Sequence, residues 1–219
     1  MESSPHRVSD VMTHAVVAVG RKALFKDIVE RMEEWKVSAL PVLEGDGRVI
    51  GVVSEADLLP KEEFRDSDPD RFTQLRRLTD LAKAGAVSAE ELMSTPAVTV
   101  HEDATLAEAA RIMALRHVKR LPVVSAEGIL EGVVSRADLL RVFLRPDNAL
   151  ADEIRRDIVD VLFPAPVEPV HIIVREGVAT LTGRVGDAAR IPLAARLVQG
   201  VEGIVGVDCR LTAVGSDAG

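Results

Sequence analysis

Apolar and polar positions along this chain follow one order that is used twice. Each stretch has a short alternating run, an amphipathic helical run, and then two apolar runs divided by a turn. This pattern predicts strand, helix, strand, strand and helix in turn. In the first stretch the expected elements span 16–19, 24–35, 39–43, 49–53 and 54–59. Pro60 is expected to stop the last helix, because proline cannot continue a helix and restricts the residue before it.

The second stretch repeats the first at a constant offset of 81 positions. Val8–Leu59 overlays Ala89–Leu140 without a gap, and both copies contain Leu-Pro-Val and end in Gly-Val-Val-Ser-x-Ala-Asp-Leu-Leu. An offset kept over this length indicates a duplicated structural unit. In the second copy Thr105 and Glu108 form a capping box ahead of the long helix, and the last helix is expected to run to Leu144.

The segments outside the two copies have different patterns. Between the copies, 61–69 is highly charged and predicts a loop, while 71–83 predicts a helix that Gly85 ends. After Pro146 we expect helix, strand, strand, helix and strand, over 150–163, 170–174, 178–185, 188–199 and 204–211. This order within one short segment suggests a small α+β domain.

These patterns together predict an α+β chain in which a duplicated unit is followed by a smaller domain. The predicted parts are an N-terminal tail (1–7), the first copy (8–60), a charged and helical linker (61–87), the second copy (88–146), the small domain (147–214) and a C-terminal tail (215–219).

Composition narrows the classes of function. Apolar residues make up 47% of the 219 residues, which favours a packed globular protein, and only 3% are aromatic, which argues against binding bases by stacking. The net charge of -8 works against binding nucleic acid, whose general affinity comes from Lys and Arg. We see no signal peptide and no apolar run long enough to cross a membrane, so we expect a cytoplasmic protein. The single cysteine, Cys209, fits a reducing compartment.

No catalytic or metal-binding arrangement is visible in the sequence. The five histidines are scattered without metal-ligand spacing, and no Ser/His/Asp or Cys/His set has the context of a nucleophile. We therefore predict a protein that is not an enzyme, with no metal site and no required cofactor.

Each copy places a Ser-x-x-Asp element where an apolar strand turns into a helix. These elements are Ser54 with Asp57 and Ser135 with Asp138. One interpretation is a helix cap, in which the serine and the acidic residue only stabilise the helix start. The other is a nucleotide site, because a serine at a helix N-terminus suits a phosphate and a carboxylate accepts hydrogen bonds from a ribose diol. The sequence leaves both interpretations open.

The two copies differ in charge just before Leu-Pro-Val. The second copy has Lys119 and Arg120 where the first has Ser38 and Ala39. If these positions line a cleft, the second copy offers two cations to a phosphate, whereas a solvated basic edge strand is the plain alternative. We expect two related but non-equivalent clefts, with a phosphate nearer the basic strand of the second copy.

Residues 8–145 resemble two cystathionine-beta-synthase (CBS) motifs in tandem, through their element order, Leu-Pro-Val and the shared ending. The resemblance implies a Bateman module, in which two motifs pack sheet to sheet about a pseudo-twofold axis, leave two clefts and form a homodimer. In this family the clefts commonly bind adenosine-containing ligands, such as AMP, ADP, ATP or S-adenosylmethionine. The site residues that it implies are Ser54, Asp57, Ser135 and Asp138 for phosphate and ribose, Lys119 and Arg120 for phosphate, and Ser38 and Ala39 at the less basic positions.

Residues 148–214 resemble a BON domain, through Gly-Val-Ala-Thr-Leu-Thr-Gly-Arg-Val at 177–185 and Val-Glu-Gly-Ile-Val-Gly-Val-Asp at 201–208. The resemblance implies a role in attachment to membranes or proteins. Because no export signal precedes this segment, we expect it to dock a protein partner rather than lipid.

Two functional hypotheses follow from these features. In the first, the CBS pair binds an adenine nucleotide as a regulatory ligand and relays this binding to the BON domain or a partner. In the second, the chain is a dimeric scaffold whose BON domain docks a protein or membrane, and the CBS pair binds no nucleotide. A third hypothesis, an enzyme, lacks a catalytic constellation.

Overall fold

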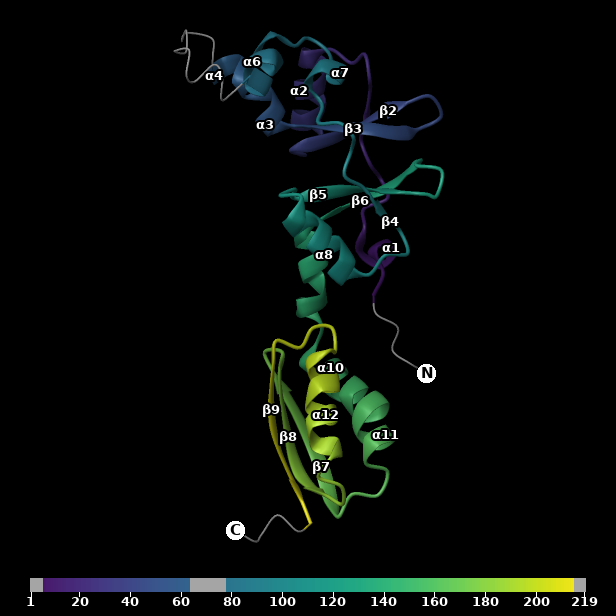
Figure 1. Cartoon of the computed structure of the whole chain (residues 1–219), viewed down its shortest axis with the longest axis vertical. Helices are drawn as coiled ribbons and strands as arrows, with labels where there is room; N and C mark the ends of the chain where they lie inside the picture. The colour runs from purple at the N-terminus through teal and green to yellow at the C-terminus, as the bar shows by residue number, and fades with distance from the viewer. Residues whose placement is uncertain (1–5, 64–77, 215–219) are drawn as a thin grey trace. The chain divides into compact units, whose positions relative to one another are not determined.

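The computed structural model describes residues 6–63 and 78–214. The chain divides into two compact units, one from Arg7 to Arg136 and one from Ala137 onward, to which His6 also belongs. Figure 1 shows the elements of both units.

Each repeat folds as strand, helix, strand, strand and helix, as predicted. The first repeat contains β1 (Val19–Gly20), α2 (Phe25–Glu34), β2 (Ala39–Glu44), β3 (Arg48–Ser54) and α3 (Glu55–Leu58). The second contains β4 (Val100–His101), α8 (Leu106–Leu115), β5 (Arg120–Val124), β6 (Leu130–Ser135) and α9 (Arg136–Leu139). In each sheet the Leu-Pro-Val strand lies in the middle, parallel to the short first strand and antiparallel to the third.

The core of the first repeat lies between helix α2 and its sheet. Ile28 and Met32, one turn apart on α2, pack with Leu40, Val42 and Val53. The equivalent positions of the second repeat are also buried: Ala109, Met113, Leu121, Val123 and Val134. The apolar residues that gave the helical and alternating patterns in the sequence are therefore those on the buried faces of the helices and strands. The predicted capping box is confirmed, since Thr105 and Glu108 close the start of α8.

The short helix that opens each repeat packs on the other repeat. After α1 (Val8–Val11), Thr13 pairs with Val133 of β6, and after α7 (Ala89–Leu92), Ser94 pairs with Val52 of β3. In each pair both amides donate to the opposite carbonyl, at 2.9–3.2 Å. The two repeats thus exchange their opening segments.

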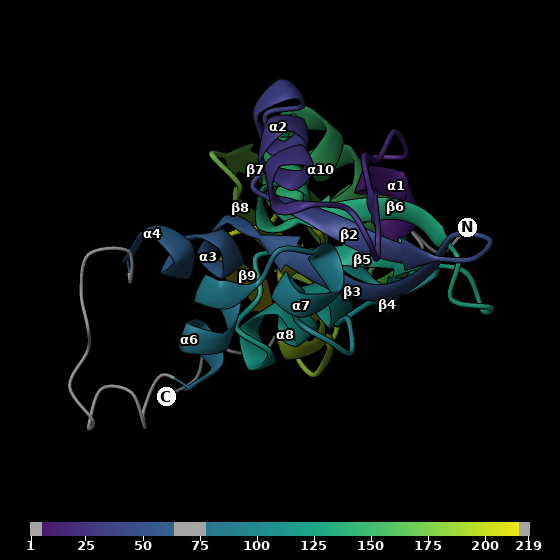
Figure 2. The same cartoon turned by 90° about the horizontal axis from the view of Figure 1, so that it is seen from above.

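The two sheets stack on each other, as Figures 1 and 2 show for β2 and β3 over β5 and β6. The hairpin tips are also joined, because Arg48 bridges Ile129 and the Leu130 amide donates to the Gly47 carbonyl at 3.0 Å. The expected sheet-to-sheet packing of the repeats is confirmed.

The linker begins differently from the prediction. Helix α3 ends before Pro60, as predicted, but Pro60 then opens another short helix, α4 (Pro60–Glu63). The reason is that proline is well suited to the first helical position, where its missing amide is not needed. The loop predicted over 61–69 is therefore wrong for its first three residues. Helix α6 (Leu78–Gly85) ends at Gly85, as predicted, while residues 64–77 lie outside the described part.

The second unit has the predicted order of helix, strand, strand, helix and strand. After a 3₁₀ turn (Leu140–Leu144), its elements are α10 (Asp147–Glu153), a π-helical stretch (Ile154–Val159), α11 (Asp160–Leu162), β7 (Glu168–Arg175), β8 (Val178–Val185), α12 (Arg190–Gln199) and β9 (Gly206–Ala213). Strand β8 lies between antiparallel β7 and parallel β9, and the helices cover one face of this sheet (Figure 1). The covered face carries the core, in which Ile154, Leu181 and Val198 are buried. Within the described ranges, no helix combines the length and apolar character that crossing a membrane requires.

Candidate functional site

A cleft of about 460 Å³ lies in the first unit, between the two repeats. Both repeats line it, the first with Ser38, Ala39, Ser54 and Asp57 among others, the second with Ser94, His117, Lys119 and Arg120 among others. A volume of this size is within the range of sites that bind small molecules.

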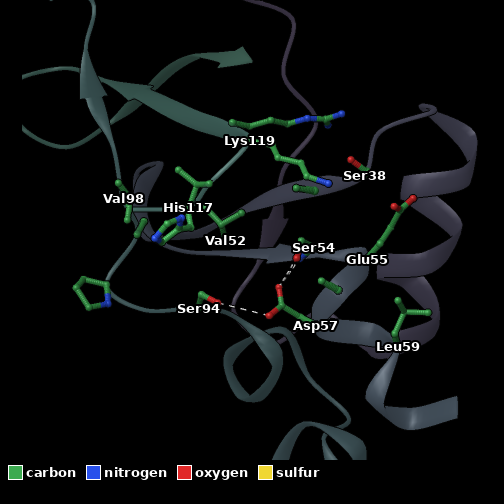
Figure 3. Close-up of a pocket in the computed structure, with 16 residues that line it drawn as sticks. Ser38, Val52, Ser54, Glu55, Asp57, Leu59, Ser94, Val98, His117 and Lys119 are labelled. Carbon is green, nitrogen blue, oxygen red and sulfur yellow. Dashed lines mark hydrogen bonds between the residues drawn. The ribbon is translucent and has the colours of Figure 1, made fainter. Parts of the chain in front are cut away.

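Asp57 is the buried charge of this cleft, with only 8% of its surface exposed. Its Oδ2 atom accepts hydrogen bonds from the Ser54 amide at 2.8 Å and from the Ser54 hydroxyl at 2.6 Å. Its Oδ1 atom pairs with the Lys83 ammonium group and lies 3.5 Å from the Ser94 hydroxyl. Figure 3 shows Ser54 and Ser94 on either side of the carboxylate.

Two amides at the start of helix α3 already have partners. The Ser54 amide donates to Asp57, and the Glu55 amide donates to the Ser38 carbonyl at 3.1 Å. These two amides are therefore already paired, so they do not form the phosphate cradle that a free helix start would provide. The helix-cap interpretation of Ser-x-x-Asp is realised here, and the amides of Ser54 and Glu55 are not available to a phosphate.

Positive charge reaches the cleft from the second repeat. Lys119 and Arg120 lead into β5, and His117 stands just before them at the end of α8 (Figure 3). His117 has a left-handed backbone with φ of 55°, which ends the helix and directs the chain into the strand. Glu55 lines the same cleft, so its negative charge partly offsets the positive charge of these residues.

The remaining wall of the cleft is apolar. Val52 on β3 belongs to the first repeat, and Pro96 and Val98 belong to the segment that follows α7. Such a surface can hold a flat base by dispersion and burial rather than by aromatic stacking.

The second Ser-x-x-Asp element lies elsewhere. Ser135 ends β6 and Asp138 belongs to α9, and neither is among the residues that line this cleft. Asp138 is buried, with 9% of its surface exposed, and its Oδ1 atom lies 3.6 Å from an Arg141 guanidinium nitrogen. Of the eight predicted site residues, the structure brings together the other six: Ser38, Ala39, Ser54, Asp57, Lys119 and Arg120.

The sequence interpretation missed how the two repeats share this cleft. It assigned Lys119 and Arg120 to a cleft of the second copy, but packing about the pseudo-twofold axis places them near Ser54 and Asp57 of the first. It also missed Ser94, which the exchange of opening segments brings to Asp57, and Lys83 in the linker. His117 was not predicted as a site residue, although its position two residues before Lys119 was a usable signal.

Comparison with known proteins agrees with this architecture. The CBS domain profile matches residues 8–61 and 89–145, so it covers both repeats and half of the chain. The chain belongs to the CBS-domain proteins. The BON domain profile matches residues 146–215, so a BON domain follows the CBS pair.

Relatives of the CBS pair occur in archaea and plants. MJ1426 of Methanocaldococcus jannaschii is 28% identical over 153 residues, which cover 63% of this chain and 90% of that protein. The chloroplastic CBS domain-containing protein CBSX2 of Arabidopsis thaliana is 30% identical over 132 residues, which cover 54% of this chain and 55% of that protein. The chain thus spans about half the length of this plant relative.

Solved structures of other CBS pairs have the same fold. A crystal structure of CBSX2 in complex with AMP superposes with a TM-score of 0.56 and 30% identity, over 64% of this chain and 97% of that one. The CBS pair of MJ0100 superposes with a TM-score of 0.50 and 19% identity, over 64% of this chain and 96% of that one.

Proposed function

We propose that this protein is a non-enzymatic sensor whose CBS pair binds an adenosine-containing ligand. The observation that carries the proposal is one cleft that combines the buried Asp57 carboxylate with Lys119 and Arg120 from the other repeat. A carboxylate suits a ribose diol, and two cations suit a phosphate, so a nucleotide uses both ends of the cleft. AMP, ADP, ATP and S-adenosylmethionine are the candidate ligands.

The proposed pose follows from the distribution of charge. The ribose hydroxyls lie against Asp57, the phosphate extends toward Lys119 and Arg120, and the base lies against Val52 and Val98. The relative CBSX2, which is 30% identical and has been crystallised in complex with AMP, supports this choice of ligand class.

We further propose that ligand binding is relayed to the BON domain. The chain after β6 enters the second unit through α9 and the 3₁₀ turn over Leu140–Leu144. At the end of that turn Arg145 pairs with the buried Glu153 and donates to the Glu202 carbonyl at 2.8 Å. Arg145, Glu153 and Glu202 all lie in the second unit, so these contacts order the segment through which the chain enters the BON domain. An ordered entry segment supports the relay.

Homodimer formation and docking of a protein partner by the BON domain stay predictions. Exposed apolar side chains on the long helices support pairing of two copies, since Trp35 follows α2 and is 53% exposed and Leu115 ends α8 and is 72% exposed. Apolar surface of this kind is stabilised when a partner covers it.

Calorimetric titration of the full chain with AMP, ADP, ATP and S-adenosylmethionine tests the ligand proposal. We expect at least one of these to bind, and Asp57→Ala to weaken it by about tenfold or more, because hydrogen bonds to a charged group are the stronger kind. Asp46→Ala is the control, since it removes an exposed carboxylate of the same repeat that does not line this cleft. In the same titration Lys119→Met should weaken AMP more than adenosine.

A complete absence of binding heat with all four compounds would refute the proposal and favour the scaffold hypothesis. Equal affinities of Asp57→Ala and Asp46→Ala would show that the nucleotide does not bind at Asp57. Thermal unfolding of each variant shows whether it is folded, because loss of a helix cap alone lowers stability by about 0.5–2 kcal/mol.

A further inference from the structure

A lysine from the linker reaches the carboxylate of the candidate ribose site. Lys83 lies near the end of α6, and its ammonium group pairs with Asp57 Oδ1. The two side chains are only 14% and 11% exposed. Charges that are this shielded from water attract each other more strongly than an exposed pair does. The contact is therefore a specific tie between the linker and the cleft.

The Asp57 carboxylate has little capacity left for another donor. Each carboxylate oxygen offers about two acceptor sites. On Oδ2 both sites are used by the amide and hydroxyl of Ser54. On Oδ1 one site holds Lys83, and the other faces the Ser94 hydroxyl at the long distance of 3.5 Å. The two hydroxyls of a ribose diol need two acceptor sites. They can therefore both bind Asp57 only after Lys83 has left it.

A second lysine fixes the same end of the linker helix without using the cleft. Lys61 on α4 donates to the carbonyls of Ala84 and Ala86 at 3.1 and 3.0 Å, and its ammonium group lies 5.2 Å above the Phe25 ring. Such a lysine at a helix C-terminus satisfies carbonyls that the helix leaves unpaired. Lys61 and Lys83 thus both hold the end of α6, and of these two lysines Lys83 is the one that pairs with Asp57.

The second repeat handles its equivalent carboxylate differently. Asp138 is approached by Arg141 from its own helical turn, with 66% of the Arg141 side chain exposed. The position equivalent to Arg141 in the first repeat is Pro60, which carries no charge. A charge partner for Asp57 consequently comes from the linker, and this ties the cleft to a separate part of the chain.

We propose that Lys83 competes with the ribose of an adenosine ligand for Asp57, so that ligand binding detaches the end of α6 from the cleft. This inference rests on the proposed function, because it needs an adenosine ligand in this cleft. In the bound state Lys61 still holds the end of α6. The linker helix is the element that changes its attachment when the cleft is occupied.

Calorimetric titration of the full chain with AMP tests the competition. If Lys83 leaves Asp57 free for about one tenth of the time, the apparent affinity for AMP is about tenfold lower than that of the free site. We therefore expect Lys83→Met to bind AMP about tenfold more tightly than the wild type. General electrostatics predicts the opposite, since loss of a cation near the cleft weakens binding of an anion. Lys26→Met is the control, because Lys26 is an exposed cation of the same repeat, 86% exposed and paired with Glu30. We expect Lys26→Met to bind AMP like the wild type.

Hydrogen exchange on the wild type gives a second readout that needs no variant. With AMP, amides of residues 78–86 should exchange faster, while amides of β3 should exchange more slowly. Ligands usually protect what they contact, so faster exchange in the linker helix is specific to release.

The outcomes separate the two proposals. Unchanged or weaker AMP binding by Lys83→Met, or added protection of residues 78–86 in the complex, would overturn the competition and leave the nucleotide site standing. If neither the wild type nor Lys83→Met binds AMP, the AMP site itself fails and the competition fails with it.

Discussion

At the scale of single residues, the two repeats share a backbone feature that their side chains do not suggest. Lys36 and His117 occupy equivalent positions and have φ of 51° and 55°. In each repeat the next amide returns to the helix, from Val37 to the Met32 carbonyl at 3.0 Å and from Val118 to Met113 at 3.1 Å. Glycine is the usual residue in this left-handed position, because a Cβ atom is strained there.

Replacing Lys36 by glycine should stabilise the protein. The left-handed conformation costs a residue with a Cβ about 1–2 kcal/mol, which exceeds the entropy cost of glycine and leaves a gain of about 0.5–1 kcal/mol. Among the described residues Lys36 pairs with Glu33, which is exposed, and such a pair adds little stability. Urea unfolding of Lys36→Gly measures the gain. Lys26→Gly within α2 is the control and should lower stability, and a loss in both variants would show that the strain is absent.

At the scale of elements, short helices are held in place by caps rather than by length. Helix α7 has only four residues, and Glu91 Oε2 accepts from the Val87 amide, the Ser88 amide and the Ser88 hydroxyl, each at 2.9 Å. The hydrogen bond from the Val87 amide, followed by those from Ser88, lowers the pKa of Glu91 below its ordinary value. Bonds from Thr105 lower the pKa of Glu108 at the start of α8 in the same way.

The free energy of unfolding should therefore fall in acid, partly because Glu91 becomes protonated. A carboxyl with a lowered pKa in the folded state contributes stability above its unfolded pKa, near 4.5, and this contribution is lost as pH falls through the folded pKa. Glu91→Gln removes this contribution, so its stability should depend less steeply on pH below about 4.5. Urea unfolding over this range in both proteins checks the slope, and parallel profiles would contradict the assignment.

Elements with a clear period could be predicted from the sequence, and those fixed by distant contacts could not. Helix α2 and strands β2 and β3 follow from the spacing of apolar residues such as Ile28 and Leu40. Within the cleft, Ser54 and Asp57 followed from the repeated ending. The pairing of Lys83 with Asp57 joins residues 26 positions apart, and no local pattern in a charged linker indicates it. The place of Ser94 could not be predicted either. Helix α7, which precedes it, has four residues, too few for a period that would indicate against which sheet it packs.

At the scale of the whole CBS pair, two glycines admit the exchanged segments. Cβ atoms at Gly51 and Gly132 would meet the Met93 and Met12 side chains, and each would also lie 3.0 Å from a backbone carbonyl, of Ser94 or Thr13. These side chains and carbonyls belong to the opening segment of the other repeat. A glycine is therefore needed on each third strand so that the other repeat can approach.

Gly51→Ala should destabilise the CBS pair by about 1–3 kcal/mol, because overpacking forces the Ser94 backbone to move. Gly20→Ala is the matched control, since a Cβ atom there meets nothing within 4 Å. We expect the control to stay within about 0.5 kcal/mol of the wild type in urea unfolding. Equal stability of the two variants would show that the exchanged segment adapts without cost.

The exchanged opening segments also set the order in which the pair can be completed during synthesis. The sheet of the first repeat receives its last partner when Ser94 emerges, soon after β3 itself. The sheet of the second repeat must instead be joined by Thr13, which emerges long before Val133 and has no partner strand until then. Late pairing over so long a separation is slow, because a large loop must close first. The opening segment of the nascent chain therefore has no partner strand until the second sheet is made. If the chain is cut at the linker, each of the two fragments lacks the opening segment that pairs with its third strand.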